Sequence, residues 1–101
     1  MRVVYAERAV HDIDEIYGAI AERSSSAAQR VEEFIRTTCI GLADFPFASA
    51  ATDEPNVRRV PRVRFPSTIF FRIDQQRDLV EIARVLHSAR VKTLRSLPDY
   101  G

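Results

Sequence analysis

Residues 58–90 read RRVPRVRFPSTIFFRIDQQRDLVEIARVLHSAR, a stretch in which β-branched and aromatic side chains are interleaved with arginines. Ser67–Ile73 is rich in Thr, Ile and Phe, and Leu79–Leu86 is rich in Val, Ile and Leu. The polar run 74–78 separates these two segments. This pattern predicts a β-hairpin with a five-residue connection. A small sheet is therefore expected to carry the function.

The two faces of this hairpin follow from the alternation of side chains along a strand. In the first strand, Thr68, Phe70 and Arg72 are expected on one face. In the second strand, uninterrupted alternation predicts two sets of residues, which are Val80, Ile82, Arg84 and Leu86 on one face and Leu79, Glu81, Ala83 and Val85 on the other.

Two amphipathic helices are predicted before the sheet. From Ala9, apolar residues recur with the spacing of one helix face, and the acidic residues, including Asp12, are expected on the solvent side. A second apolar period runs from Ala27 to Asp44 and includes Cys39. The serines 24–26 interrupt the two periods and offer an N-cap to the second helix. The segment 9–44 is thus predicted to form an antiparallel helical hairpin.

The remaining segments complete an α+β domain that spans residues 1–101. Met1–Tyr5 is a strand candidate, and 48–56 is expected to be an irregular loop. Val57–Phe65 is expected to be an edge strand or to carry a bulge, because its Pro61 lacks an amide donor. Ser88–Leu97 is expected to form a short terminal helix. The predicted fold is an N-terminal strand, a helical hairpin, and a three-stranded antiparallel meander with the hairpin on one face.

The composition is that of a soluble globular protein, with 46% hydrophobic and 29% charged residues. A single cysteine precludes an intramolecular disulfide and favours the reducing cytoplasm. We expect no membrane span, no metal site and no cofactor. The net charge of +1 hides an asymmetry: residues 1–56 hold five arginines against ten acids, whereas residues 57–95 hold ten basic residues against three acids. A basic half of this kind suits an acidic peptide or a phosphate backbone.

Six phrases occur in an order that resembles the ParE/RelE superfamily of bacterial type II toxins, and the ParE branch in particular. They are an early strand ending in Tyr5 and Ala6, DIDEIYGAIAE (12–22), AAQRVEEFI (27–35), LADFP (42–46), FPSTIFFRID (65–74) and VLHSAR (85–90). The chain departs from the pattern where FPFASAATDEP replaces the frequent Gly-Arg after the Phe-Pro turn, and where Ser67 replaces a frequent aromatic residue. These departures weaken an inference of activity against gyrase but leave the fold unaffected.

The resemblance implies a toxin that is neutralised by a cognate ParD-like antitoxin. ParE-type members are described as inhibitors of DNA gyrase, whereas RelE-type relatives cut messenger RNA in the ribosome. Because one fold serves both activities, side chains must decide between them. We favour inhibition by binding, with no catalytic residue assigned and no sequence-specific DNA binding by the toxin alone. The alternatives are a RelE-like ribosome-dependent endonuclease and a module that binds an antitoxin but has lost its target.

The candidate site residues follow from the charge pattern and the predicted strands. The antitoxin is expected to contact an arginine-rich surface and to add a strand at an unpaired edge. The residues expected there are Arg58, Arg59, Arg62, Arg64, Phe70 and Arg72. If the chain were a nuclease, the catalytic candidates would be Arg72, His87 and Arg90, with Tyr100 in the tail. For His87 we favour a structural role at a strand end. For Arg72 an ion pair with Asp74, Glu81 or an acid of the helices is an equal alternative to partner binding.

Overall fold

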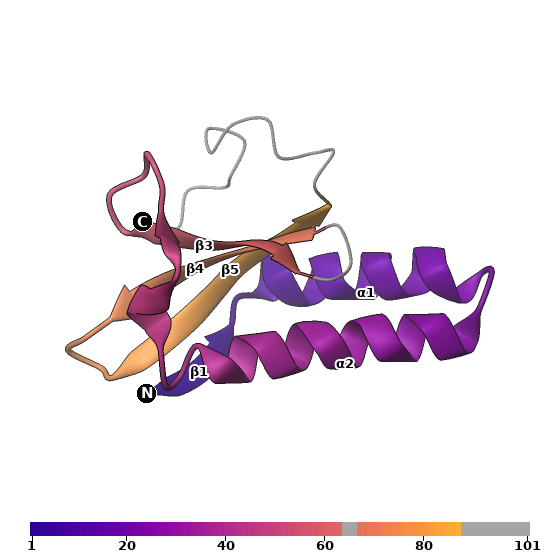
Figure 1. Ribbon diagram of the computed structural model, residues 1–101, viewed down its shortest axis with the longest axis horizontal. Helices are drawn as coiled ribbons and strands as arrows, with labels where there is room; N and C mark the ends of the chain where they lie inside the picture. The colour runs from indigo at the N-terminus through magenta and orange to yellow at the C-terminus, as the bar shows by residue number, and fades with distance from the viewer. Residues whose placement is uncertain (64–66, 88–101) are drawn as a thin grey trace.

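The computed structural model describes residues 1–63 and 67–87, which form a helical hairpin packed on one face of a sheet (Figure 1). The elements in chain order are β1 (Arg2–Tyr5), α1 (Glu7–Ala21), α2 (Ser25–Gly41), a 3-10 turn η1 (Pro46–Ala48), β2 (Ala50–Ala51), β3 (Val57–Val63), β4 (Ser67–Asp74) and β5 (Leu79–His87). The predicted α+β class is confirmed. The helix expected at Ser88–Leu97 lies outside the described residues, as do the last two residues of the strand expected at Val57–Phe65.

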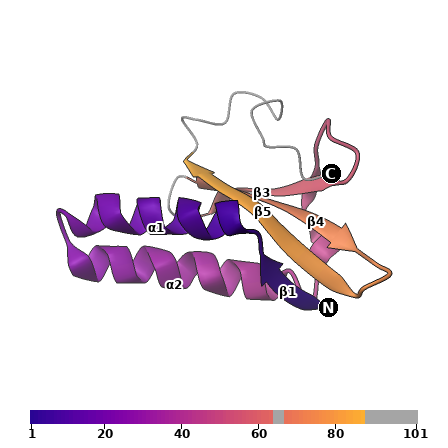
Figure 2. The same cartoon turned by 180° about the vertical axis from the view of Figure 1, so that it is seen from behind.

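The hairpin forms where the sequence predicts it, and both views show the two helices side by side (Figure 2). Ser24 is the N-cap of α2, and its hydroxyl accepts a hydrogen bond from the amide of Ala27 at 3.1 Å. Cys39 is buried, as expected. The solvent position predicted for Asp12 is wrong, because this side chain is buried between α1 and the sheet.

The sheet has the strand order β1-β5-β4-β3-β2. β1 runs parallel to β5, with Val3 paired to Val80, and the other neighbours are antiparallel. The three-stranded meander is confirmed, and β1 and β2 extend it on its two sides. The irregular loop expected at 48–56 is wrong at Ala50–Ala51, where a two-residue strand pairs with β3.

A bulge in β5 corrects the predicted alternation of its side chains. Phe71 pairs with Ile82 while Phe70 pairs with Arg84, so that Ala83 is an extra residue. Alternation therefore resumes one residue later, and Val85 instead of Arg84 faces the helices beside Ile69. A second irregularity in register falls between Val60 and Val63, around Pro61.

The hairpin between β4 and β5 is closed by the turn 75–78. Asp74 Oδ1 accepts a hydrogen bond from the amide of Arg77 at 3.0 Å, which satisfies a backbone donor within the turn. Asp78 has φ 54°, a left-handed conformation that Asp adopts more readily than most residues. These two acids explain why the connection is tight.

The main core lies between the helices and the sheet, and it consists of Ala9, Ile35, Cys39, Leu42, Ile69, Phe71, Val80, Ile82 and Val85. A smaller cluster of Val57, Phe70 and Leu86 lies on the opposite face. In the part of the chain that the structure describes, no helix covers this second face (Figures 1 and 2).

Candidate functional site

The face of the sheet opposite the helices carries arginines from β3 and β4 together with Phe70. Arg59 on β3 pairs with Phe70 on β4, and Phe70 pairs with Arg84 on β5, whose guanidinium binds Asp12 of α1. Directly opposed residues on neighbouring strands point to the same face, as do residues two apart on one strand. Arg72 therefore shares this face with Phe70. Phe70 and Arg72 thus share one face of β4, as predicted, and no described helix covers that face.

Burial differs sharply among these residues. Phe70 is 1% exposed and packs with Val57 and Leu86, whereas the Arg59 side chain is exposed. Arg72 is half-buried, and its Nη1 lies 3.9 Å from Oε1 of Glu81 on the neighbouring strand. This long ion pair matches the structural alternative considered for Arg72. Arg59 is the arginine on this face that the described structure presents openly to a partner.

Arg58 points to the other face and binds the segment that follows α2. Its Nε donates to Ser49 Oγ at 3.0 Å, and its Nη2 donates to the Ser49 carbonyl at 2.6 Å and to the Phe47 carbonyl at 3.4 Å. Its guanidinium carbon lies 5.5 Å from the centroid of the Phe47 ring. The described contacts of Arg58 therefore hold η1 against β3.

Other predicted site residues cannot be placed by their side chains. Arg62 and His87 belong to β3 and β5, but the structure describes only their backbone. Arg64, Arg90 and Tyr100 lie outside the described residues. The nuclease set of Arg72, His87 and Arg90 therefore stays a prediction.

Sequence reasoning missed the buried ion pair of Asp12 with Arg84. Arg84 Nε lies 2.6 Å from Asp12 Oδ2, and Arg84 Nη2 lies 2.9 Å from Asp12 Oδ1. The side chains are 10% and 6% exposed for Arg84 and Asp12, respectively. A signal was present, because Asp12 lies three residues after Ala9 and four before Ile16, within the inward arc of the helix. The pair joins α1 to β5 beside the bulge.

A shallow apolar hollow of about 210 Å³ lies between the two helices near the end of β1, with Tyr5, Val10 and Ile13 among its lining residues. Burial raises the pKa of the neighbouring Cys39 thiol to about 11. Burial, with a smaller contribution from Cys39, raises the pKa of the Tyr5 phenol to about 12. Both groups are therefore protonated near neutral pH, which makes Cys39 a poor nucleophile or metal ligand.

The described residues form neither a metal site nor a membrane-spanning helix. Within 1–63 and 67–87, no group of three or more His, Cys, Asp and Glu side chains is arranged to hold a metal ion. Neither α1 nor α2 is long and apolar enough to cross a membrane. The described arginine-bearing strands offer charged side chains and a strand edge for pairing.

A family model described as "ParE toxin of type II toxin-antitoxin system, parDE" matches residues 3–92. The chain belongs to the ParE toxin family. It is thus a ParE-like toxin component of a type II toxin–antitoxin system, as the resemblance implied. The parDE pairing in the family description supports an antitoxin of the ParD kind as its partner. No curated protein matches the sequence.

Solved structures share the fold of this ParE family member at low sequence identity. The chromosomal ParDE system from P. aeruginosa matches with a TM-score of 0.74 and 21% identity, over 86% of this chain and 95% of that chain. The isolated E. coli RelE toxin matches with a TM-score of 0.63 and 13% identity, over 90% and 87%. A mutant of E. coli RelE in the free state gives a TM-score of 0.69 and 11% identity, over 95% and 92%. These likenesses establish the ParE/RelE fold.

Proposed function

We propose that this chain inhibits DNA gyrase by binding to it, and that a ParD-like antitoxin prevents the inhibition by covering the arginine-bearing strands β3 and β4. Membership of the ParE family supports the toxin role, and the family resemblance supports gyrase as the target. The observation that carries the antitoxin site is an incompletely paired strand edge at β3, flanked by an exposed arginine. Inhibition by binding requires no cofactor.

The edge of β3 offers backbone groups to a partner. β2 pairs only with Arg58 and Arg59, whereas β3 continues to Val63. Within the described residues, no strand pairs with the outer edge of 60–63. An extended peptide can add to such an edge through main-chain hydrogen bonds, with side chains supplying the specificity. We therefore place a strand of the antitoxin along β3.

Arginines around this edge supply the charge that such a peptide would meet. Arg59 is exposed and has no carboxylate within 4.0 Å among the described residues. Arginine forms bidentate bonds with carboxylates, which suits an antitoxin segment rich in Asp or Glu. The proposed antitoxin-binding set is Arg58, Arg59, Arg62, Arg64, Phe70 and Arg72. Within this set, Arg59 is proposed to contact the antitoxin directly, whereas buried Phe70 supports the sheet.

Two activities measured in parallel test the proposal. The purified chain would be added to gyrase in a supercoiling assay and to translating ribosomes in an assay of messenger RNA cleavage, with and without the protein encoded in the adjacent reading frame. We expect inhibited supercoiling that the neighbouring protein reverses, together with intact message. Normal supercoiling with cut message would instead identify a nuclease. Normal results in both assays, together with binding of the neighbouring protein, would identify a module without a target.

The second candidate function is that of a RelE-like ribosome-dependent endonuclease. The overlap with two RelE structures favours it as the alternative, and Arg72 lies on the sheet face where a phosphate could be bound. This alternative predicts that Arg72→Gln or His87→Gln abolishes message cleavage and leaves affinity for the antitoxin largely intact. Gyrase inhibition would be absent from the unmodified chain.

A further inference from the structure

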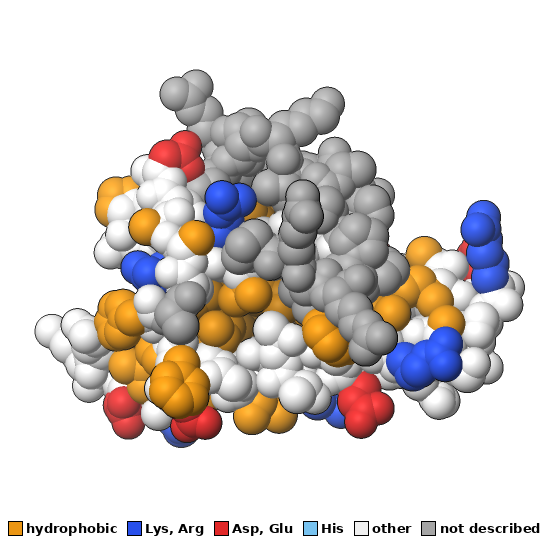
Figure 3. Space-filling view, in the orientation of Figure 1, with side chains coloured by type: hydrophobic (Ala, Val, Ile, Leu, Met, Phe, Trp, Pro, Cys, Tyr) orange, Lys and Arg blue, Asp and Glu red, His pale blue; other side chains and the backbone are white. Residues whose placement is uncertain are grey.

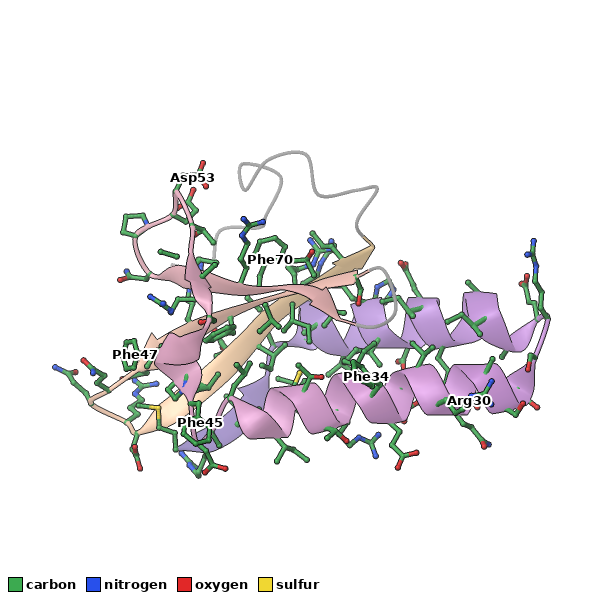
Figure 4. The ribbon with its side chains drawn as sticks, in the orientation of Figure 1. Arg30, Phe34, Phe45, Phe47, Asp53 and Phe70 are labelled. Atoms are coloured by element: carbon green, nitrogen blue, oxygen red, sulfur yellow. The ribbon has the colours of Figure 1, made fainter. Side chains whose placement is uncertain are left out.

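A turn at the end of α2 presents two aromatic rings to solvent. Phe45 is 73% exposed and Phe47 is 57% exposed, and Ile40 on the last turn of α2 is 58% exposed. Figure 3 shows apolar side chains at this end of the molecule, and Figure 4 labels Phe45 and Phe47 on the segment that follows α2. Large exposed aromatic side chains that lie together are a common feature of protein interaction sites.

The turn is held rigidly, although its rings are exposed. Arg58 donates to the carbonyls of Phe47 and Ser49 and to the Ser49 hydroxyl. That hydroxyl in turn donates to the Pro46 carbonyl at 2.7 Å. The backbone of the turn is therefore fixed at Pro46, Phe47 and Ser49, which reduces the conformational entropy that the turn loses when a partner binds.

A hollow of about 150 Å³ opens beside Phe47 and gives the surface its chemical character. Its walls are Phe47, Pro55, Asn56, Arg58, Ile73 and Gln75. Three of these side chains carry N–H donors, whereas none carries a carboxylate. Arg58 has no carboxylate within 4.0 Å among the described residues. The hollow thus has the donors and the charge to receive an acidic side chain.

We propose that this aromatic turn, defined as Phe45, Phe47 and the adjoining hollow, binds a segment of the antitoxin in which an Asp or Glu lies next to large apolar residues. The carboxylate enters the hollow toward Arg58, Asn56 and Gln75, while the apolar residues cover the two rings. This assignment rests on the antitoxin partner proposed above. It extends the binding site beyond the β3 edge to the loop that precedes β2.

A pair of neighbouring glutamines supplies a matched test. Gln75 and Gln76 are both exposed on the turn between β4 and β5, but only Gln75 lines the hollow. Gln75→Glu would repel an incoming carboxylate, whereas Gln76→Glu changes the net charge equally. Affinity for the protein from the adjacent reading frame would be measured by calorimetry. We expect Gln75→Glu to weaken binding at least about tenfold and Gln76→Glu to change it less than about twofold. Equal effects of the two variants would overturn the proposal.

A second pair of variants tests the aromatic contribution. The double substitution Phe45→Ser and Phe47→Ser is expected to weaken the complex at least about tenfold. Val10→Ser is its control, because Val10 is 47% exposed and belongs to α1, outside the turn and the hollow beside Phe47. Circular dichroism would confirm that each variant is folded. Unchanged affinity of the double variant would contradict the assignment.

The remaining outcomes separate this surface from the proposed function. If the wild-type chain forms no complex with the neighbouring protein, then the antitoxin proposal fails and the surface assignment fails with it. If a complex forms and none of these substitutions changes its affinity, only the surface assignment fails. Loss of gyrase inhibition with unchanged antitoxin affinity would assign the turn to the target. Self-association that the double serine variant abolishes would assign it to a second copy of the chain.

Discussion

Asp12 on α1 and Arg84 on β5 form a bidentate ion pair across 72 positions of sequence. Asp12 Oδ2 also accepts a hydrogen bond from the backbone amide of Val85 at 3.0 Å. β1 ends its pairing with β5 at Ile82, so that this carboxylate serves an amide that β1 does not reach. One acidic side chain therefore joins the helical hairpin to the sheet and accepts a hydrogen bond from a backbone amide of β5 that lies beyond the pairing with β1.

Replacing Asp12 with Ala is expected to destabilise the fold by about 3–5 kcal/mol, because it leaves the buried Arg84 charge without its carboxylate. Urea unfolding followed by circular dichroism measures the change in the free energy of unfolding. The control is Asp14→Ala on the exposed side of α1, with an expected change within about 0.5 kcal/mol. Equal destabilisation by both substitutions would show that the pair contributes nothing specific.

Removing the serine hydroxyl that caps α2 is expected to lower stability by about 1 kcal/mol. Ser24→Ala loses the hydrogen bond from the Ala27 amide at 3.1 Å, leaving a donor of the first turn without its acceptor. Ser25→Ala, at the next position, is the matched control and should change stability by only a few tenths of a kcal/mol. Thermal unfolding of the three proteins would separate the two serines.

The fold is expected to lose stability as the pH rises from about 9 to about 11. The ordinary pKa of a cysteine thiol is 9.0, and burial raises the pKa of Cys39 to about 11. In this window the unfolded chain releases the proton while the folded chain keeps it, so that the unfolded state binds fewer protons and the free energy of unfolding falls. The raised pKa of Tyr5 acts in the same direction above pH 10.

Cys39→Ala tests this alkaline effect, because it removes the thiol. The slope of unfolding free energy against pH between 9 and 11 should become shallower, whatever the variant's stability at neutral pH. Urea titrations at a series of pH values give the slope. An identical slope in both proteins would show that the thiol is not the titrating group.

Truncating an aromatic residue is expected to cost much stability in the sheet and little in the turn. Phe71→Ala should destabilise the fold by about 3–5 kcal/mol, because Phe71 is fully buried in the main core. Phe45→Ala, at a 73% exposed position, should alter stability by less than about 0.5 kcal/mol. Chemical denaturation measures both, and a large loss at Phe45 would show that the turn serves the fold rather than a partner.

Much of the architecture was predictable, because it depends on local patterns. The 3.6-residue period identified both helices, and Ser24 marked the start of α2. Alternation of apolar residues identified β4 and β5, and Pro61 marked the irregular part of β3. Each of these signals lies within a single helix or strand, or at its end.

The features that sequence reasoning missed depend on contacts between distant segments. The bulge at Ala83 exists only relative to the register of β4, and the burial of Asp12 depends on Arg84. Phe45 and Phe47 are exposed, and the contacts of Arg58 with Phe47 and Ser49 join residues nine to eleven positions apart, which no local pattern encodes. The arginine set was predicted from the charge pattern and the expected strands, whereas the contacts of Arg58 with Phe47 and Ser49 required the folded chain.

The parallel pairing of β1 with β5 has a consequence during translation. Val3 and Val80 are neighbours in the sheet, so the first strand has no partner until residue 80 has left the ribosome. Contacts of such high sequence separation slow folding, because the loop entropy is lost before the pairing is gained. A nascent toxin therefore cannot complete its sheet before β5 has left the ribosome, which leaves a co-produced antitoxin time to be present when the toxin has folded.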